Sequence, residues 1–435
     1  MGEKITEGTF GATEFFDQLE GYARREIQRW MQKLLEEEVT SVLGRVKGGR
    51  KASVDRASGY RNGFGKVRRF SMSSGTIEVR RPRVRGLEAR FESRVLPLFR
   101  RRTKEVGELL PQLYLHGLSQ GDFELALRGL LGDGAPLSGS SIERLRGTWQ
   151  AEHDAWQKRS LKGIEPVYLW ADGVYVKAGL EKEKAALLVV IAGLRDGRKV
   201  VLAVEPGYRE SQESWSSLLR SLKSRGIQMP KLVVADGHLG IWSAMGEIFP
   251  EVEQQRCWNH KIVNVLDRIP KTQQAAARAL LCAMPYAETR QEAEEQRDGF
   301  IERFGKAYPD AAKILRADWE RMVTFYGFPK EHWKHLRTTN IVESPFAAVR
   351  LRTTAAKRFK KVANATALIW RVLLVAERSF RRLDHPQLLA EVAEGPSTGM
   401  AFESWRRSTP AIKRPPPDAV YTPIDGTSPD PREIP

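Results

Sequence analysis

Three acidic residues, Asp172, Asp236 and Glu343, are of a type that suits metal-dependent chemistry, because Mg²⁺ prefers carboxylate oxygens as ligands. Asp172 interrupts the apolar, aromatic segment YLWADGVYVKAG (168–179), where a charge is costly unless something compensates for it. Asp172 and Gly173 between two short apolar runs also form a type I′ hairpin signal, and a surface turn needs no compensation. These residues alone leave two interpretations open, a carboxylate within a strand and a turn.

The other two acids also have a functional and a structural interpretation. Asp236 follows the apolar segment KLVVA, and the carboxyl ends of strands in open α/β sheets form the ligand crevice; its alternative is a turn-forming or capping aspartate. Glu343 lies in RTTNIVESPFAAVRLRTT, where Pro345 is tolerated only in a first helical turn, so a helix is predicted to begin within 341–344. Asn340 and Glu343 also have the spacing of a capping box, which needs no chemistry.

The segments that carry the acids predict an α/β sheet core. Three strand-like segments, EPVYLWADGVYVKAG, KAALLVVIAGLRDG and KVVLAVEPG, precede the Ser-capped helix SQESWSSLLRSLKSRG. KLVVADGH and EQQRCW continue as strands, each followed by a helix, and the resulting order is βββαβαβα. The acids then lie on the first strand, on the strand after the first long helix and on the closing helix. That distribution is typical of a ribonuclease-H-like core with a mixed sheet.

Composition divides the C-terminal part of the chain further. Residues 271–338 are rich in Ala, Glu, Gln and Arg without strand signals and predict an all-helical insertion. The catalytic domain is therefore predicted at 160–270 and 339–385, where Trp370 and its apolar neighbours are interpreted as core of the closing helix. The Pro-rich tail, 396–435, is expected to be disordered.

The N-terminal part is predicted to be mainly helical with one basic arm. Apolar residues at helical spacing predict a helix within 1–44, whose stripe packs internally or on a second subunit as a dimerisation segment. Residues 45–103 form the basic arm, in which KVRRFSMSSGTIEVRRPRVRG, after the Gly-rich stretch that ends in YRNGFG, predicts two strands around Ser73-Ser74-Gly75.

Residues 104–156 predict three short helices, the second capped by Ser119 and the third by Ser140 or Ser141. This pattern fits a helix-turn-helix-like DNA-binding unit whose last helix reads the DNA, with GDGAPLSGS as the turn. A structural three-helix bundle fits the same pattern equally well.

The charge of the chain points to a polyanion as partner. Among 435 residues, 71 Lys and Arg exceed 54 Asp and Glu, which gives a net charge of +17 and a pI of about 9.8. Residues 80–104 hold ten basic and two acidic side chains, interleaved with Val, Leu and Phe, which favours a phosphate-contacting surface over a merely solvated one. The candidate DNA contacts are Arg80, Arg81, Arg83, Arg85, Arg100, Arg101, Arg102, Arg144, Arg146, Arg350 and Arg352.

Several classes of protein are disfavoured. The first residues lack a basic segment followed by an apolar one, so no signal peptide is predicted, and the longest apolar run, AALLVVIAGL, is too short to span a bilayer. Two cysteines, Cys257 and Cys282, exclude a disulfide framework. We therefore expect a cytoplasmic, nucleoid-associated protein that does not bind membranes.

The sequence resembles the bacterial Mutator-type insertion-sequence transposases. Four motifs in the family's order carry the resemblance: LWADGVYVK, VVADGHLGIWSA, QQRCWNHKIVNVLDRIPK and TTNIVESPFAAVRLRT. The resemblance extends from the YRNGFG segment to about residue 385, and the Pro-rich tail lies outside it.

The resemblance implies a DDE transposase that cleaves and joins DNA at the terminal inverted repeats of an insertion sequence. Asp172, Asp236 and Glu343 match the family's three acidic positions, and a homodimer or larger assembly that binds double-stranded DNA is implied. Three convergent carboxylates repel one another and would take up protons, whereas two Mg²⁺ or Mn²⁺ ions favour the charged forms and support phosphodiester chemistry. The alternatives are another ribonuclease-H-like integrase or nuclease, and a catalytically inactive DNA-binding regulator.

Residues near the acids are predicted to support them. Cys257-x-x-His260 suggests zinc, but no second ligand pair has a suitable spacing, so we expect no zinc. Cys257 is instead expected to be core at the end of the last strand, with His260 and His238 orienting a carboxylate or a phosphate and Asn340 nearby. Gly173 and Gly237 are expected to let the DNA backbone approach closely.

Overall fold

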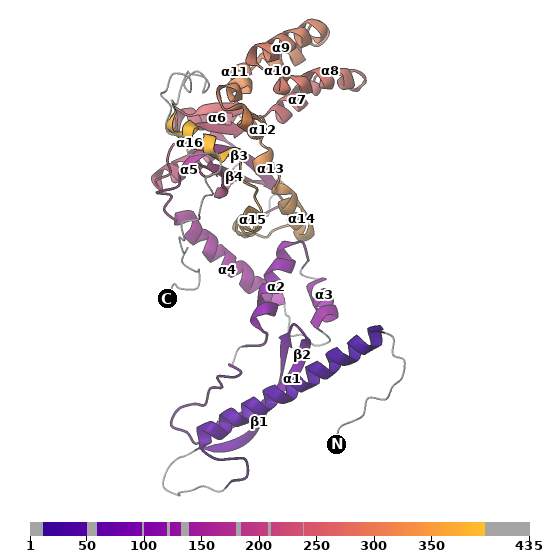
Figure 1. Cartoon of the computed structure of the whole chain (residues 1–435), viewed down its shortest axis with the longest axis vertical. Coiled ribbons are helices and arrows are strands. Elements are labelled where there is room, and N and C mark those ends of the chain that lie inside the picture. Colours follow the sequence, from indigo (N-terminus) through magenta and orange to yellow (C-terminus); the bar gives the residue numbers. More distant parts are fainter. Residues whose placement is uncertain are drawn as a thin grey trace.

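The structure is a computed structural model that describes residues 12–49, 59–97, 100–119, 122–131, 139–179, 184–207, 210–237 and 239–395. The molecule is elongated (Figure 1). A long helix with a β-hairpin forms one end, a five-stranded sheet with helices on both faces follows, and a group of helices forms the other end.

The N-terminal unit consists of α1 (Ala12–Leu43) and the strands β1 (Tyr60–Met72) and β2 (Gly75–Arg85). The predicted hairpin is confirmed, with Met72 paired to Gly75 across Ser73 and Ser74. β1 starts earlier than expected, because YRNGFG continues the strand through two register irregularities instead of forming a loop.

The apolar stripe of α1 is covered over only part of its length. Met31 and Leu35 are buried in one cluster with Ile77 and Val79 of β2, so the C-terminal half packs internally along that side. Phe16 and Leu19 of the first half, in contrast, are 61% and 48% exposed. The internal interpretation of the stripe is therefore confirmed for its second half, and the dimerisation segment stays a prediction for the first.

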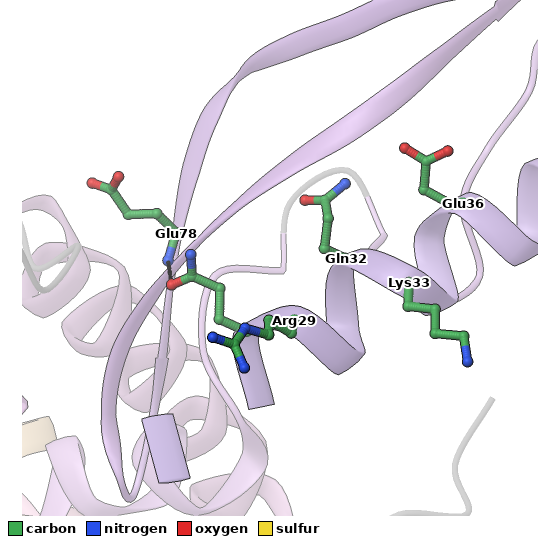
Figure 2. Close-up of a pocket in the computed structure, with 6 residues that line it drawn as sticks. Arg29, Gln32, Lys33, Glu36 and Glu78 are labelled. Carbon is green, nitrogen blue, oxygen red and sulfur yellow. Dashed lines mark hydrogen bonds between the residues drawn. The ribbon is translucent and has the colours of Figure 1, made fainter. Parts of the chain in front are cut away.

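Two glutamines of α1 bind the free edge of β2. The Gln32 side chain accepts from Arg80 N and donates to Arg80 O, both at 2.9 Å, and Gln28 Oε1 accepts from Glu78 N at 3.3 Å. Backbone groups of an edge strand that would otherwise lack partners are thus satisfied by side chains. A cavity of about 340 Å³ lies beside this contact (Figure 2) and contains none of the predicted site residues; its lining is Gln28, Arg29, Gln32, Lys33, Glu36 and Glu78.

Three helices follow, as predicted: α2 (Lys104–Leu115), α3 (Asp122–Leu131) and α4 (Gly139–Lys158). Ser119 accepts from Asp122 N at 3.3 Å, in agreement with its capping role. The cap at Ser140 or Ser141 is wrong, because α4 already begins at Gly139 and both serines lie in its first turn. Most of the predicted turn GDGAPLSGS, at 132–138, lies outside the described residues.

The C-terminal half of α4 is attached to the sheet core. Trp149 and His153 are buried, and His153 Nε2 lies 3.0 Å from Val204 O. This half is therefore a packed structural helix, which supports the bundle interpretation for that part of the unit.

The central sheet has the order β5-β4-β3-β6-β7. β4 is antiparallel to β3 and β5, whereas β6 is parallel to β3 and β7 to β6. The elements occur in the expected order βββαβαβα: β3 (Pro166–Val176), β4 (Ala185–Leu194), β5 (Lys199–Gly207), α5 (Gln212–Ser224), β6 (Leu232–Ala235), α6 (Leu239–Ile248), β7 (Glu253–Arg256) and α7 (Trp258–Leu266).

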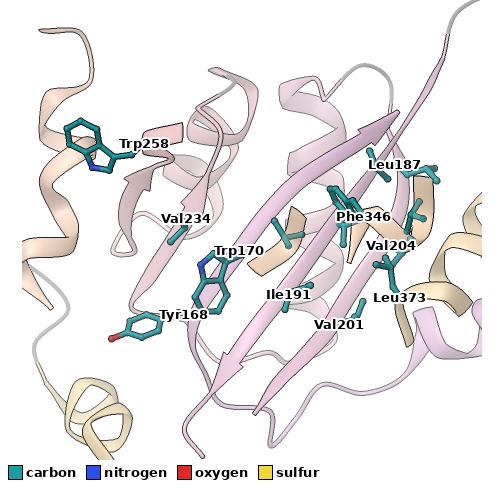
Figure 3. Packing of buried hydrophobic residues seen from close by; sticks show 14 of the residues in the cluster. Tyr168, Trp170, Leu187, Ile191, Val201, Val204, Val234, Trp258, Phe346 and Leu373 are labelled. Carbon is teal, nitrogen blue, oxygen red and sulfur yellow. The ribbon is translucent and has the colours of Figure 1, made fainter. Parts of the chain in front are cut away.

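Side chains alternate between two cores, one on each face of the sheet. Trp170 and Ile191 belong to the core that contains Leu373 (Figure 3), whereas Leu169 and Val190 face α5 and α6. Trp370 is 2% exposed and packs in the first core, so its predicted role in the closing helix is confirmed.

Residues 271–338 contain only helices and loops, as predicted. The elements are α8 (Lys271–Ala283), η1 (Met284–Tyr286), α9 (Arg290–Phe304), α10 (Pro309–Arg316), α11 (Trp319–Val323), η2 (Thr324–Gly327), η3 (Lys330–His332) and α12 (Trp333–Leu336).

The chain then returns to the sheet through α13 (Asn340–Glu343), α14 (Phe346–Ala356) and α15 (Val362–Glu377), and α16 (Pro386–Glu394) follows. The sequence did not predict α16, whose Leu389 is fully buried. Residues 396–435 lie outside the described part of the chain. Within the described part, no helix is both long and apolar enough to cross a bilayer.

Candidate functional site

Asp172 lies within β3 and pairs with Val189 of β4, so the hairpin interpretation of Asp172-Gly173 is wrong. The chain reverses only after Val176, and sheet pairing outweighs the local turn signal. Asp172 shares the alternation of Trp170, which directs it to the face on which α13 contacts β3 and β4. Burial raises the pKa of Asp172 to about 7, and the charges of Glu210 and Glu343 add to this effect.

Asp236 follows the last residue of β6, at the carboxyl end of the strand, as the sequence predicts. Its Oδ1 lies 3.3 Å from His260 Nδ1. The same imidazole nitrogen lies 3.9 Å from Glu343 Oε1, so His260 stands between the two carboxylates.

Electrostatics makes His260 a cation in this arrangement. The Cys257 side chain raises the pKa of His260 most, the charges of Asp236 and Glu343 raise it further, burial opposes them, and the result is about 9. The two carboxylates lie within 4 Å of Nδ1 without a hydrogen bond of acceptable geometry, so they act on the imidazole through their charge.

Glu343 ends α13 instead of beginning a helix. α13 starts at Asn340, one residue before the predicted range, and Thr339 occupies the cap position. The capping box is wrong as well, because the Glu343 carboxylate accepts a hydrogen bond from the Thr339 hydroxyl and not from the backbone of Asn340. The carboxylate thereby stays on the side of α13 that faces His260.

A second set of potential ligands overlaps this site. Single ligand atoms of Cys257, His260 and Glu343 lie within 4.8 Å of one another, and they form the metal-capable group found among the described residues. The sequence suggested Cys257 and His260 as an incomplete zinc pair but did not connect Glu343 with them. Asp172 and Asp236 do not belong to this compact group, so the three acids do not all lie at ligand distance from one another.

Glu210 is a fourth acid at the site that the sequence did not reveal. It is 6% exposed, and its backbone φ is 48°, a conformation that few residues other than glycine adopt. It accepts a hydrogen bond from Tyr175, and burial together with Glu210 raises the pKa of that phenol strongly. The only sequence signal is its position in the loop before the Ser-capped helix α5.

Side chains of the protein itself occupy the space beside the two glycines next to the acids. A Cβ on Gly173 would lie 2.2 Å from Glu210 Oε1, and one on Gly237, where φ is +103°, would lie 2.3 Å from Arg256 Nε. The expectation that these glycines admit the DNA backbone is therefore wrong in this structure. Their small size instead makes room for Glu210 and Arg256.

The remaining supporting residues have different environments. Asn340 Oδ1 accepts from Asn259 at 3.2 Å, close to Glu343. Cys257 is fully buried directly after β7, as expected; its Sγ accepts from Thr339 N at 3.4 Å and lies 3.2 Å from the Thr339 hydroxyl oxygen. His238 lies outside the described residues.

Most of the arginines proposed to contact DNA are at least partly exposed. Arg80, Arg83 and Arg85 are exposed on β2, and Arg350 is exposed on α14. Partial or full exposure also holds for Arg81, Arg100, Arg101, Arg102, Arg144 and Arg146.

Arg352 does not belong to the exposed arginines, and its predicted contact with DNA is wrong. It is 2% exposed, its guanidinium lies 3.7 Å from the Tyr114 ring centroid, and it donates to Leu118 O at 3.0 Å. It therefore connects α14 to α2 and is not available to DNA.

Comparison with known proteins places this sequence in a family. The sequence profile described as "Transposase, Mutator family" matches residues 7–382. The transposase for insertion sequence element IS6120 of Mycolicibacterium smegmatis is 44% identical over 290 residues, which cover 67% of this chain and 90% of that protein. The transposase for insertion sequence element IST2 of Acidithiobacillus ferrooxidans is 38% identical over 272 residues, 62% of this chain and 92% of that protein. A more distant relative, the transposase for insertion sequence element ISRM5 of Rhizobium meliloti, is 30% identical over 352 residues, 80% of this chain and 85% of that protein.

Proposed function

The chain belongs to the Mutator family of transposases, and on this premise we propose that Asp172, Asp236 and Glu343 form the catalytic site for DNA cleavage and strand transfer at the ends of an insertion sequence. The observation that carries the proposal is the position of His260 within 4 Å of Asp236 and Glu343, while the charge of Glu343 also reaches Asp172. An acid at a strand end and an acid on a helix thus lie beside one cation, and the charges of Glu343 and His260 reach the acid in the middle of β3.

We propose a ribonuclease-H-like fold for the core. The strand order supports it, because β3 lies at the centre with β4 antiparallel to it and to β5 on one side, and with parallel β6 and β7 on the other. Asp172 on β3 and Asp236 after β6 therefore lie on neighbouring strands, which pair from Tyr168 with Leu232 to Ala171 with Ala235.

The residues at the site fit divalent metal ions. Burial, with the charges of Glu210 and Glu343, raises the pKa of Asp172 and so disfavours a bare carboxylate, and His260 Nδ1 is a buried polar atom without a hydrogen bond beside two carboxylates. A set of carboxylates selects hard cations, so we propose two Mg²⁺ or Mn²⁺ ions held by Asp172, Asp236 and Glu343. When bound, such ions would supply activation of a water or a 3′-hydroxyl and stabilisation of the leaving oxygen.

The protein side chains keep the site ready for metal. Protonated His260 balances Asp236 and Glu343, which lowers their mutual repulsion in the absence of metal. The Thr339 hydroxyl restrains Glu343, and Gly173 N restrains Asp172 through a hydrogen bond of 2.8 Å to Oδ1. Burial of Asp172 limits the access of water to its carboxylate.

DNA is proposed to bind along the basic arm. The exposed arginines of β2 can each neutralise a phosphate, and their backbone is held in place by the pairing with β1 and by Gln32. A homodimer or larger assembly is proposed as well, and the exposed apolar residues in the first half of α1 support it.

The proposal is tested by Mg²⁺-dependent nicking of an element end, followed by joining of a pre-cut 3′-hydroxyl end to target DNA. Asp172→Asn, Asp236→Asn and Glu343→Gln keep shape but remove ligand charge, so both reactions should collapse while DNA binding persists. Near-normal nicking by one variant removes that residue from the site. Nicking without joining would indicate a nuclease, and DNA binding without either reaction in the wild type would indicate a regulator.

A further inference from the structure

Arg256, the last residue of β7, holds the backbone on which Asp236 stands. Its Nε donates to Asp236 O at 3.2 Å, and its side chain fills the space beside Gly237. Its backbone is paired with Ala235, the residue before Asp236. The position of the Arg256 guanidinium therefore limits where Asp236 can lie.

Asp318, in the helical insertion, holds that guanidinium. Its Oδ2 accepts from Arg256 Nη1 at 2.6 Å and lies 3.8 Å from Lys261 Nζ, while its Oδ1 accepts from Arg321 at 3.0 Å. Lys261 is 1% exposed and Arg256 is mostly buried, so Asp318 is the carboxylate that balances two largely desolvated cations. The Asp318 backbone has φ of 63°, which places the side chain at the start of α11.

The insertion is attached to β7 by further buried contacts. The Gln255 side chain donates to Met322 O at 3.0 Å and accepts from Phe325 N at 2.8 Å. Trp258 Nε1 also donates to Met322 O, at 2.8 Å. A displacement of α11 would therefore move Asp318 and β7 together.

We infer that Asp318 is a positioning residue for Asp236, which acts through Arg256 and makes the metal affinity of the sheet site depend on the helical insertion. This inference rests on the proposed role of Asp236 as a metal ligand. Without the charge of Asp318, Arg256 loses its strongest contact and the carbonyl of Asp236 loses a fixed donor. The carboxylate of Asp236 then samples orientations that do not meet those of Asp172 and Glu343.

The test uses the full-length protein and Asp318→Asn, because asparagine tolerates the left-handed backbone and keeps the shape of the side chain. Mn²⁺ affinity is measured without DNA by electron paramagnetic resonance, and the Mg²⁺ concentration for half-maximal nicking is measured separately. We expect both to weaken by roughly 10- to 100-fold, as for other residues that orient metal ligands, with the maximal nicking rate largely recovered at high Mg²⁺. Glu320→Gln is the matched control, since this acid also lies in the insertion but is 78% exposed and pairs with Arg290 at the surface.

Arg256→Lys is the second variant, and it keeps the positive charge if Asp318→Asn does not fold. A lysine cannot bind Asp318 and Asp236 O at the same time, so Mn²⁺ affinity should fall by a similar factor. The double variant should then be no weaker than either single variant, because both changes break one connection.

The outcomes separate a positioning role from a structural one. A lower melting temperature with unchanged Mn²⁺ affinity in the folded variants would show that Asp318 only stabilises the insertion, and would overturn the inference. Asp236→Asn distinguishes this result from failure of the proposed function. If the wild type and Asp236→Asn bind Mn²⁺ equally, the metal site is wrong and the inference is wrong with it.

Discussion

The substitution Asp172→Asn should make the metal-free protein more stable. Burial, with help from Glu210 and Glu343, raises the pKa of Asp172 from 3.8 to about 7. Each pKa unit corresponds to about 1.4 kcal/mol, so the shift amounts to about 4 kcal/mol against the ionised form, and partial exposure reduces the expected effect to about 2 kcal/mol. For a domain of this size that is a rise of roughly 4–8 °C in melting temperature.

The pH dependence has a definite sign. Because the folded pKa exceeds the unfolded one, the folded state binds more protons between these values, and stability falls as the pH rises from 3.8 to about 7. The advantage of the asparagine variant should thus be full at about pH 8 and roughly half as large at about pH 5.5. Saturating Mg²⁺ should cancel or reverse it, because metal binding stabilises only the wild type.

The assay is thermal unfolding in a chelator and in Mg²⁺ at both pH values, with Asp196→Asn as the control. Although burial opposes it, hydrogen bonds from Arg198 hold the pKa of Asp196 below its usual range, so removal of that charge should lower the melting temperature. If Asp172→Asn melts at or below the wild-type temperature in chelator at about pH 8 while the control behaves as expected, the assignment of uncompensated charge to Asp172 is refuted.

Two further predictions concern DNA and zinc. Arg80→Ala and Arg83→Ala should weaken DNA binding at an unchanged melting temperature. The slope of log affinity against log salt concentration should fall by about 0.9 for each phosphate that is no longer neutralised. Arg352→Ala should instead lower the melting temperature and keep the slope, and equal slopes for all variants would contradict the prediction. Metal analysis of the chelator-treated protein should find no stoichiometric zinc. Cys257→Ser should fold, because a serine can accept the hydrogen bond that Thr339 donates to the sulfur of Cys257. One tightly held zinc per chain would show that Cys257 and its neighbours form a metal site.

Elements with a long repeating pattern could be predicted from sequence. The strands β3 to β6 follow from apolar runs, which report burial directly, whereas β7 (Glu253–Arg256) has no apolar residue and is placed by its position between two helices. Local sequence signals fail at Asp172, because Asp-Gly in isolation predicts a turn and only the pairing with Val189 excludes it. They also fail at the start of α13. The helix is capped by Thr339, one residue before the predicted cap, and this changes the group that the Glu343 carboxylate contacts.

Residues whose role depends on contacts between distant segments could not be predicted. Glu210 approaches Gly173 across 37 positions, and no repeat or motif connects them. Arg350 and Arg352 are neighbours on one helix, yet one faces solvent and the other packs on Tyr114, a residue of α2. Charge composition predicts a basic surface but not which cations belong to it.

The hydrogen bonds between α1 and the hairpin make the two elements move as one rigid unit. Arg24 donates to Ser74 O at 3.0 Å, and the 12 residues from Arg24 back to Ala12 extend about 18 Å beyond this contact. A tilt of the hairpin by about 10 degrees therefore moves the far end of the helix by about 3 Å. The way in which DNA binds the arginine-lined arm thus determines where the exposed Leu19 is presented.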